Sequence, residues 1–314
     1  MSIPSEVGTA VQSGAKVVAS VSGGKDSTAM ALHLMEIGVD FIPVFMDTGW
    51  EHDATYEYLN TLEGQLGIEI VRLQSEGMES LCIRKGVFPS KTRRFCTEAL
   101  KVKPMKAFLS GFDDPVNAVG VRSGESLARS KLSATEEGRH VDALVWRPIL
   151  DWTLEDVVEI HRRHGVAPNP LYEMGAERVG CWPCVFSRKS EIRLISEIDP
   201  PRIDRLRALE ERLTSDLRSN PDRMARAERD AEERAKTSGY SVEQELSRTS
   251  DRTFFHGKGP SRFRGLQPPT DIDTIVEWSK TVRGGWQYPL FDDDGPSACV
   301  RWGLCEAPGN DDED

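Results

Sequence analysis

The segment from residue 16 to residue 37 constrains the fold more strongly than any other part of the chain. A short run rich in valine, Lys16 to Val21, is followed by the polar loop Ser22-Gly23-Gly24-Lys25-Asp26-Ser27. Apolar residues then recur at helical spacing, at Met30, Leu34 and Ile37. This order predicts a buried strand, a glycine-containing loop and a helix.

The same alternation continues along the chain. Residues 41–46, 68–73 and 116–121 are apolar runs that predict strands, and residues 55–66 and 153–164 have the spacing of helices. Strands that alternate with helices form parallel sheets covered on both faces. We therefore expect an α/β fold with a doubly wound, mostly parallel sheet and a helical C-terminal extension.

The character of the sequence changes near residue 200. Residues 202–236 are crowded with both signs of charge and carry leucines at helical spacing, which predicts a solvated helical region. We expect a nucleotide-binding catalytic domain over 1–195 and a charged helical region over 196–256. Residues 257–314 are expected to form a linker and a segment that folds back.

Composition narrows the class of protein. Of the 314 residues 38% are hydrophobic, and no stretch approaches the roughly 20 apolar residues of a membrane span. The start, Met1 to Glu6, lacks the basic end and apolar centre of a secretory signal, so we expect a cytoplasmic protein without membrane partners. The net charge of −11 argues against wrapping duplex nucleic acid with the whole surface but permits a local basic patch.

The loop has the chemistry of an anion site. Backbone N–H groups and the positive end of a helix converge between a strand and a helix, and glycines let phosphate oxygens approach the main chain. Lys25 supplies a point charge, Ser22 and Ser27 supply hydroxyl donors, and Asp26 can hold Mg²⁺. The pattern is neither of the two common glycine-rich nucleotide loops. The alternative is an ordinary capped turn.

Further motifs follow in order, and together with the loop they resemble the PP-loop family of ATP pyrophosphatases, within the adenine nucleotide alpha-hydrolase-like superfamily. The closer likeness is to its phosphoadenosine-phosphosulfate (PAPS) reductase-like branch, over about residues 16–190. The motifs are Asp47-Thr48-Gly49 with Tyr56, Arg94-Phe95-Cys96 with Lys101, Gly120-Val121-Arg122, Arg147-Pro148-Ile149, Asn169-Pro170-Leu171-Tyr172 and Gly180-Cys181-Trp182-Pro183-Cys184.

The resemblance implies a HUP-like doubly wound sheet with an adenine nucleotide at the carboxyl ends of its strands. Strand-and-loop order favours the same placement. It also implies that ATP is cleaved between its α and β phosphates, with Lys25, Asp26 and Arg122 as catalytic residues. The implied nucleotide contacts are Ser22, Gly23, Gly24, Lys25, Asp26, Ser27, Asp47, Thr48, Gly120 and Arg122.

Two sets of charged residues are candidates for substrate binding. Arg122 and Arg129 follow a predicted strand end, where they could grip phosphate or sulfate oxygens with Glu125 nearby, although a surface salt-bridge set is the alternative. Arg94 and Lys101 belong to a basic cluster that could hold a second, polyanionic substrate, and a merely solvated helix and loop is equally compatible. The cluster comprises Arg84, Lys85, Lys91, Arg93, Arg94, Lys101, Lys103 and Lys106.

The six cysteines are too few for a disulfide scaffold in a chain of this length. Cys181 and Cys184 form a C-x-x-C pair, which alone does not separate zinc, iron–sulfur, redox and coincidental roles. The resemblance to assimilatory adenylyl-sulfate reductases implies a [4Fe-4S] cluster that includes Cys96. A fourth thiolate is then required, for which we favour Cys305 over Cys299. Zinc remains the alternative metal, and scattered structural thiols are the alternative to any site.

Three functions are compatible with these features. In the first, the protein cleaves ATP to AMP and pyrophosphate, adenylylates a substrate and supports iron–sulfur-dependent sulfur transfer, as in nucleic-acid thiolating members of the family. In the second, it is a sulfonucleotide reductase that releases sulfite, with a C-terminal cysteine as nucleophile. The complete loop favours ATP, because sulfonucleotides have no β,γ-pyrophosphate to hold. The third is a nucleotide-binding module without turnover, acting through a partner.

Overall fold

The structure is a computed structural model. The residues that it describes are 3–90, 93–138, 141–255 and 271–281. The described residues divide into two compact units, the first from 3–77, 97–138 and 141–182 and the second from 78–90, 93–96, 183–255 and 271–281. Of the predicted linker and fold-back segment over 257–314, the structure describes only residues 271–281, and the cysteines Cys299 and Cys305 lie outside the described residues.

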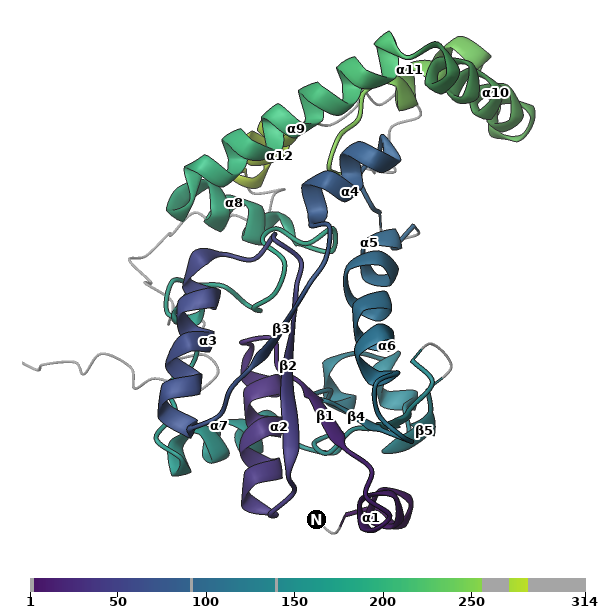
Figure 1. Cartoon of the computed structure of the whole chain (residues 1–314). Helices are drawn as coiled ribbons and strands as arrows, with labels where there is room; N and C mark the ends of the chain where they lie inside the picture. The colour runs from purple at the N-terminus through teal and green to yellow at the C-terminus, as the bar shows by residue number, and fades with distance from the viewer. Residues whose placement is uncertain (1–2, 91–92, 139–140, 256–270, 282–314) are drawn as a thin grey trace, which may run out of the picture. The chain divides into compact units, whose positions relative to one another are not determined.

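The first unit is built on a six-stranded sheet with the order β3-β2-β1-β4-β6-β5 (Figure 1). All neighbouring strands are parallel except β5, which runs antiparallel to β6. The strands are β1 (Val17–Ser20), β2 (Phe41–Asp47), β3 (Val71–Gln74), β4 (Val116–Val119), β5 (Thr135–Glu137) and β6 (Leu144–Trp146). The expected α/β fold with a mostly parallel sheet is confirmed.

Helices cover both faces of this sheet because successive strand residues point to opposite sides. Ala19 of β1 lies in an apolar cluster with Leu34, whereas its neighbour Val18 lies in the cluster of the opposite face with Leu109. One face is covered by α1 (Ser5–Gln12), α2 (Lys25–Glu36), α3 (Asp53–Leu66) and α7 (Leu154–Arg163). The other is covered by α6 (Lys103–Leu109), which follows α5 (Phe95–Thr97) and the π-helical turn η1 (Glu98–Val102).

Strand β3 begins later than the sequence predicts, at Val71 rather than at residue 68. Helix α3 ends at Leu66, and the next residue, Gly67, has a φ of +63°. The N–H of Ile70 then donates to Glu63 Oε1 at 2.7 Å. Because the N–H of Ile70 is bound to this side chain, it is not free to pair with β2, and residues 68–70 lie outside the strand.

The second unit is helical. It contains α4 (Met78–Lys85), α8 (Lys189–Ile198), α9 (Pro200–Ser219), α10 (Pro221–Ser238), α11 (Val242–Ser250) and α12 (Ile272–Ser279). Residues 202–236, for which the sequence predicts a solvated helical region, therefore lie in two helices, α9 and α10. The break comes at Asn220, whose side chain accepts from Arg223 N at the start of α10, with Pro221 as its first residue.

A buried carboxylate in α9 joins two distant parts of the second unit. Glu210, 6% exposed, accepts hydrogen bonds from Phe254 N at 2.8 Å and from Ile272 N at 3.0 Å. Burial raises the pKa of Glu210 to about 7, although the two N–H donors act in the opposite direction. The protonated form is therefore favoured more strongly in the folded protein than in the unfolded chain.

This raised pKa predicts a specific pH dependence of stability. The contribution of Glu210 is fully present below its unfolded pKa and is lost as pH rises through about 7. We expect the free energy of unfolding of the wild type, relative to a Glu210→Gln variant, to fall by ~3 kcal/mol or less between pH 4.5 and pH 8. Urea unfolding of both proteins across this range measures the difference. Parallel pH profiles for the two proteins would contradict it.

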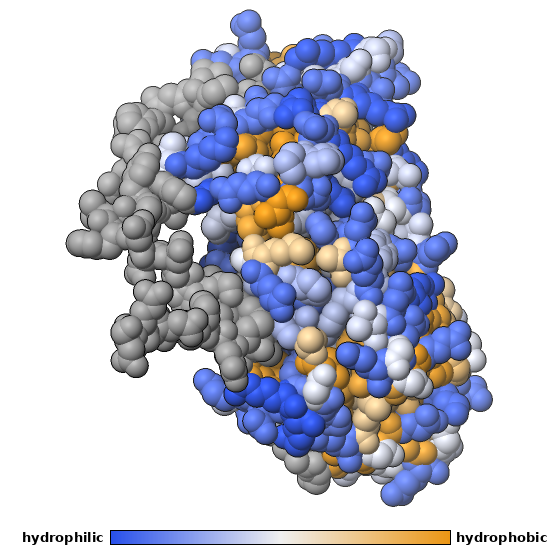
Figure 2. All heavy atoms as spheres, turned by 90° about the vertical axis from the view of Figure 1, so that its left-hand side faces the viewer, coloured by the Kyte–Doolittle hydropathy of each residue, from blue (hydrophilic) through white to orange (hydrophobic). Residues whose placement is uncertain are grey.

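No helix among the described residues is long and apolar enough to cross a lipid bilayer. Figure 2 shows a face on which hydrophilic side chains predominate and apolar ones form small groups. Among the described residues, the exposed large apolar side chains are scattered along the sequence, and Leu127 is the most exposed at 86%.

Candidate functional site

The order of the strands marks one place on the sheet of the first unit. From β1 the chain moves outward through α2 to β2 and β3, and it then returns through α6 to the other side of β1, at β4. In open α/β sheets, ligands bind outside the carboxyl ends of the strands where the order reverses in this way. The loop 22–24 follows β1 and residues 120–122 follow β4, so both lie at this point.

The loop after β1 is held by its own hydroxyl groups. Ser22 N donates to Ser27 Oγ at 3.0 Å, and Ser27 Oγ donates to the carbonyl oxygen of Gly24 at 2.9 Å. Gly23 has a φ of +73°, which a residue with a Cβ rarely adopts. Within the described residues, the N–H groups of Gly23 and Gly24 donate no hydrogen bond. Two donors therefore remain at the positive end of α2.

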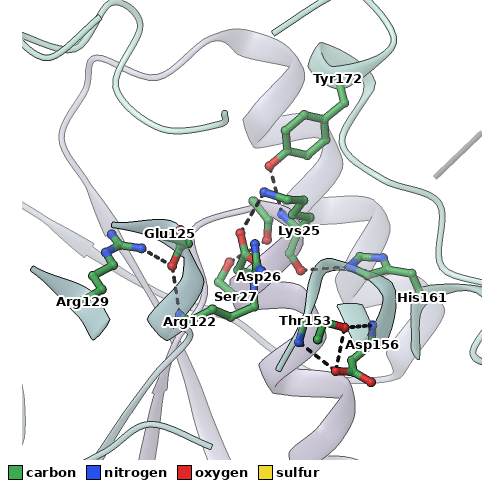
Figure 3. Close-up of polar contacts among 11 residues, drawn as sticks. Lys25, Asp26, Ser27, Arg122, Glu125, Arg129, Thr153, Asp156, His161 and Tyr172 are labelled. Atoms are coloured by element: carbon green, nitrogen blue, oxygen red, sulfur yellow. Dashed lines mark hydrogen bonds and ion pairs between the residues drawn. The ribbon is translucent and has the colours of Figure 1, made fainter. Parts of the chain in front are cut away.

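Three charged side chains meet beside this loop (Figure 3). Asp26 lies between two cations, with Oδ2 2.9 Å from Lys25 Nζ and Oδ1 2.5 Å from Arg122 Nε. Burial on its own raises the pKa of Asp26, but Lys25 and Arg122 outweigh it, so the pKa lies below its usual value. The carboxylate stays charged, and the three groups together leave one excess positive charge at the crevice.

Side chains from residues 161–172 hold the backbone of the loop after β1 in place. Tyr172, in the short helix η4 (Pro170–Tyr172), accepts a hydrogen bond from Lys25 N at 3.1 Å, and its ring lies 5.7 Å from Lys25 Nζ. His161 of α7 places Nε2 2.9 Å from the carbonyl oxygen of Lys25. Asn169 donates to the carbonyl oxygen of Gly23 at 3.2 Å. These buried contacts hold the loop in one conformation.

Gly120, directly after β4, packs against the backbone at the start of α2. A Cβ at this position would lie 2.7 Å from the Cα of Ser27 and 2.9 Å from the carbonyl oxygen of Asp26. Both contacts are with backbone, which cannot turn aside as a flexible side chain does. Only glycine fits here, and it lets Arg122 reach Asp26.

This contact predicts the effect of Gly120→Ala. The added methyl group must displace the start of α2, so we expect the ATP binding that the sequence predicts for this loop to weaken about tenfold and the free energy of unfolding to fall by ~1–3 kcal/mol. Calorimetric titration with ATP and thermal unfolding measure the two effects. The matched control is Gly64→Ala in α3, where a Cβ would meet no atom within 4 Å and where alanine is the better helix former. Equal behaviour of the two variants would contradict the argument.

The loop after β2 carries a second group of polar side chains. Asp47 Oδ1 accepts from Gly49 N at 2.9 Å and from the hydroxyl of Tyr56 at 2.8 Å. Its Oδ2 accepts no hydrogen bond from the described residues. Burial and the two carboxylates nearby, those of Asp47 and Glu51, raise the pKa of Tyr56, so its hydroxyl stays a donor. Asp47 therefore presents one carboxylate oxygen at the carboxyl edge of the sheet.

Sequence reasoning missed Glu51, which organises this loop. It is 4% exposed and accepts from the hydroxyl of Thr48 at 2.7 Å, from Thr48 N at 3.3 Å and from Trp50 N at 3.2 Å. The thiol of Cys181 lies 3.9 Å from Glu51 Oε1. Thr48 itself is fully buried, and its hydroxyl turns toward Glu51. A glutamate four positions after a strand has no distinctive sequence pattern, so only the fold exposes this role.

Comparison with known proteins identifies the family. The model of the phosphoadenosine phosphosulfate reductase domain matches residues 16–186. The chain belongs to this family. The region matched contains the whole of the site described above, from the loop after β1 to Tyr172.

Proteins similar to this chain cover different shares of it. An uncharacterized 37.8 kDa protein of Escherichia phage 186 is 31% identical, over 92% of this chain and 96% of its own. Adenosine 5′-phosphosulfate reductase 2 of Bacillus subtilis is 23% identical, over 55% of this chain and 74% of its own. The crystal structure of a PAPS reductase from Candida auris is 15% identical, with a TM-score of 0.46, over 58% of this chain and 97% of that one.

The residues predicted to bind substrate in this PAPS reductase family member do not form one group in the structure. Arg129 pairs with Glu125, and Glu125 also accepts from Arg122 N at 2.9 Å (Figure 3). Arg122 itself turns to Asp26, so only this arginine of the two contacts the loop residues. Lys101 lies half-buried in η1 of the first unit. Arg94 belongs to the second unit, where its guanidinium stacks 5.0 Å from the ring of Phe186.

Three of the four predicted ligands of the iron–sulfur cluster, Cys96, Cys181 and Cys184, lie within the described residues. Cys181 lies in the first unit, near Thr48 and Glu51, whereas Cys96 and Cys184 belong to the second. All three are half-buried thiols. In the described part of the chain, no three His, Cys, Asp or Glu side chains are grouped to hold a metal ion. The cluster, with Cys305 as fourth ligand, stays a prediction, and no step below passes through it.

Proposed function

We propose that this protein binds ATP at the loop after β1 and cleaves it between the α and β phosphates, so that AMP is transferred to an acceptor and pyrophosphate leaves. The observation that carries this proposal is the pair of N–H donors at Gly23 and Gly24, at the start of α2 and beside Lys25 and Arg122. Donors of this kind at a helix start bind phosphate oxygens. These N–H groups, with Lys25 and Arg122, provide donors and positive charge for an extended polyphosphate.

The residues have separate roles in this reaction. An acceptor oxygen attacks the α phosphorus, the bond from that phosphorus to the bridging oxygen breaks, and the electron pair leaves with pyrophosphate. Lys25 and the glycine N–H groups stabilise the charge that develops on the leaving group. Asp26 orients Lys25 and Arg122, since each of its oxygens contacts one of them.

Magnesium accompanies ATP in this proposal and shields charge on the phosphates. Both oxygens of Asp26 already contact cations, so binding of Mg²⁺ there would require one ion pair to open. Asp47 offers the carboxylate oxygen that accepts nothing from the described residues. We therefore assign a magnesium-bound water to Asp47 rather than to Asp26.

The acceptor we propose is one that receives sulfur after adenylylation, such as a nucleic-acid base or phosphate. Displacement of AMP by a sulfur nucleophile completes that transfer. A [4Fe-4S] cluster bound by Cys96, Cys181, Cys184 and Cys305 would supply or accept sulfur when present. Every phosphate step relies on residues of the loop and its neighbours alone.

A specific observation favours a second candidate function. The family bears the name of a reductase, and a curated relative over 55% of the chain is an adenosine 5′-phosphosulfate reductase. In this alternative a thiolate attacks the sulfur of the sulfonucleotide and AMP leaves. A reductant then attacks the sulfur that carries the sulfonate and releases sulfite.

One experiment separates these functions. The protein is incubated with ATP or with adenylyl sulfate, and pyrophosphate, phosphate and sulfite are measured together with the affinity for each nucleotide. We expect tighter binding of ATP, with AMP and pyrophosphate as products. Sulfite release from adenylyl sulfate in the presence of a dithiol, without affinity for ATP, would overturn the proposal. Binding of ATP without any product would identify a nucleotide-binding module.

A further inference from the structure

Three segments of the second unit meet near the end of α4, and each brings an arginine. The ring of Phe88 packs 5.4 Å from the ring of Phe254, which places the segment after α4 beside residues 252–254. From α10, Arg223 lies directly over Gly86, because a Cβ there would be 2.8 Å from its Nη1. Arg93 and Arg252 complete the set, which we call the arginine cluster: Arg93, Arg223 and Arg252.

These three arginines differ from most others in the same unit in that they form no salt bridge with another described residue. Arg205 pairs with Glu79, Arg207 with Asp273 and Arg218 with Asp251. By contrast, Arg93, Arg223 and Arg252 make no salt bridge with the residues that the structure describes. Arg223 Nη2 reaches only a carbonyl oxygen, that of Ile83, at 3.4 Å.

Arg252 has a buried side-chain nitrogen, Nε, without a hydrogen-bond partner among the described residues. Burial first, and then the charges of Arg234, Arg223 and Arg93, lower the pKa of Arg252, while Asp230 acts in the opposite direction. The positive charges of Arg223 and Arg93 thus lie close enough to act on Arg252, and a bound anion would offset this repulsion.

We propose that the arginine cluster binds the phosphodiester backbone of a nucleic acid. Guanidinium groups match phosphate oxygens in geometry, and three of them from three segments suit a chain of repeated phosphates. Arg84 and Lys85, both exposed at the end of α4, extend the positive charge beside Gly86. Phe88 and Phe254 are each 2% exposed, so this region offers no apolar side chain of theirs to a membrane surface.

Binding of fluorescein-labelled single-stranded DNA, followed by anisotropy between about 50 and 200 mM NaCl, tests the proposal. We expect Arg93→Gln, Arg223→Gln and Arg252→Gln each to weaken binding about threefold to tenfold at the lowest salt concentration. Each loss should also reduce the slope of log affinity against log salt by about 0.7. Arg93 is exposed, so its variant keeps the fold, and thermal unfolding checks the other two.

The matched control is Arg229→Gln, an exposed arginine of the same helix α10 that points about 120° away from Arg223. Its affinity should stay that of the wild type. Wild-type binding by all three cluster variants, an equal loss in the control, or binding of anionic lipid vesicles in place of DNA would overturn the proposal. The assay needs no ATP, so failure of the proposed ATP chemistry leaves its outcome unaffected.

Discussion

Replacement of Lys25 by alanine should weaken ATP binding by about thirtyfold to a hundredfold and abolish measurable pyrophosphate release. The ammonium group lies at the start of α2 with Asp26 beside it, and a charge-assisted contact to phosphate contributes about 2–3 kcal/mol. Arg122 still balances Asp26 in the variant, so the fold should persist. Calorimetric titration with magnesium–ATP measures the affinity.

The matched control for this variant is Lys16→Ala. Lys16 is exposed and precedes β1, so it lies at the opposite end of the strand from the loop. It should bind ATP as the wild type does. If Lys25→Ala binds ATP normally, the assignment of the loop as the phosphate site is wrong.

Protein purified without oxygen should be brown and carry about four irons per chain. We expect Cys96→Ser, Cys181→Ser, Cys184→Ser and Cys305→Ser each to lose iron, because a cubane cluster needs four ligands. Iron and sulfide analysis together with the visible absorption spectrum measures this. A colourless protein with one zinc would contradict the assignment.

Cys82 provides the control for the cysteine series. It is fully buried in α4, where we expect it to pack as a small apolar group. Cys82→Ala should leave the iron content unchanged. Loss of iron in this variant but not in Cys181→Ser would show that the ligand set is different.

The sequence predicted those parts of the fold that local patterns specify. The strand, loop and helix predicted over residues 16–37 are present in the structure. Each is specified by a local pattern: a run rich in valine, then a turn that contains glycine, then apolar residues at helical spacing. Strands β5 and β6 were not predicted, since three residues each are too few to show a period. The late start of β3 depends on a bond between Glu63 and Ile70 that no local pattern reveals.

The candidate site was predictable in its residue types but not in its pairings. Lys25, Asp26 and Arg122 were named from the sequence, yet 96 positions separate Asp26 from Arg122, and only the β1–β4 pairing brings them together. Glu51 and His161 were missed for a related reason. Glu51 accepts from a backbone N–H of its own loop, and His161 contacts the backbone carbonyl of Lys25, which is far away in the sequence. Contacts between a side chain and the backbone leave no recognisable sequence motif.

Both edges of the sheet in the first unit end in short, charged strands. At one edge, β3 carries Arg72, which pairs with Glu63, and at the other, β5 consists of Thr135, Glu136 and Glu137. Short length and charge keep an edge from accepting a strand of another molecule. Concentrated protein should therefore resist aggregation by edge-to-edge strand addition, and any contact between copies of this unit must use its helices or loops.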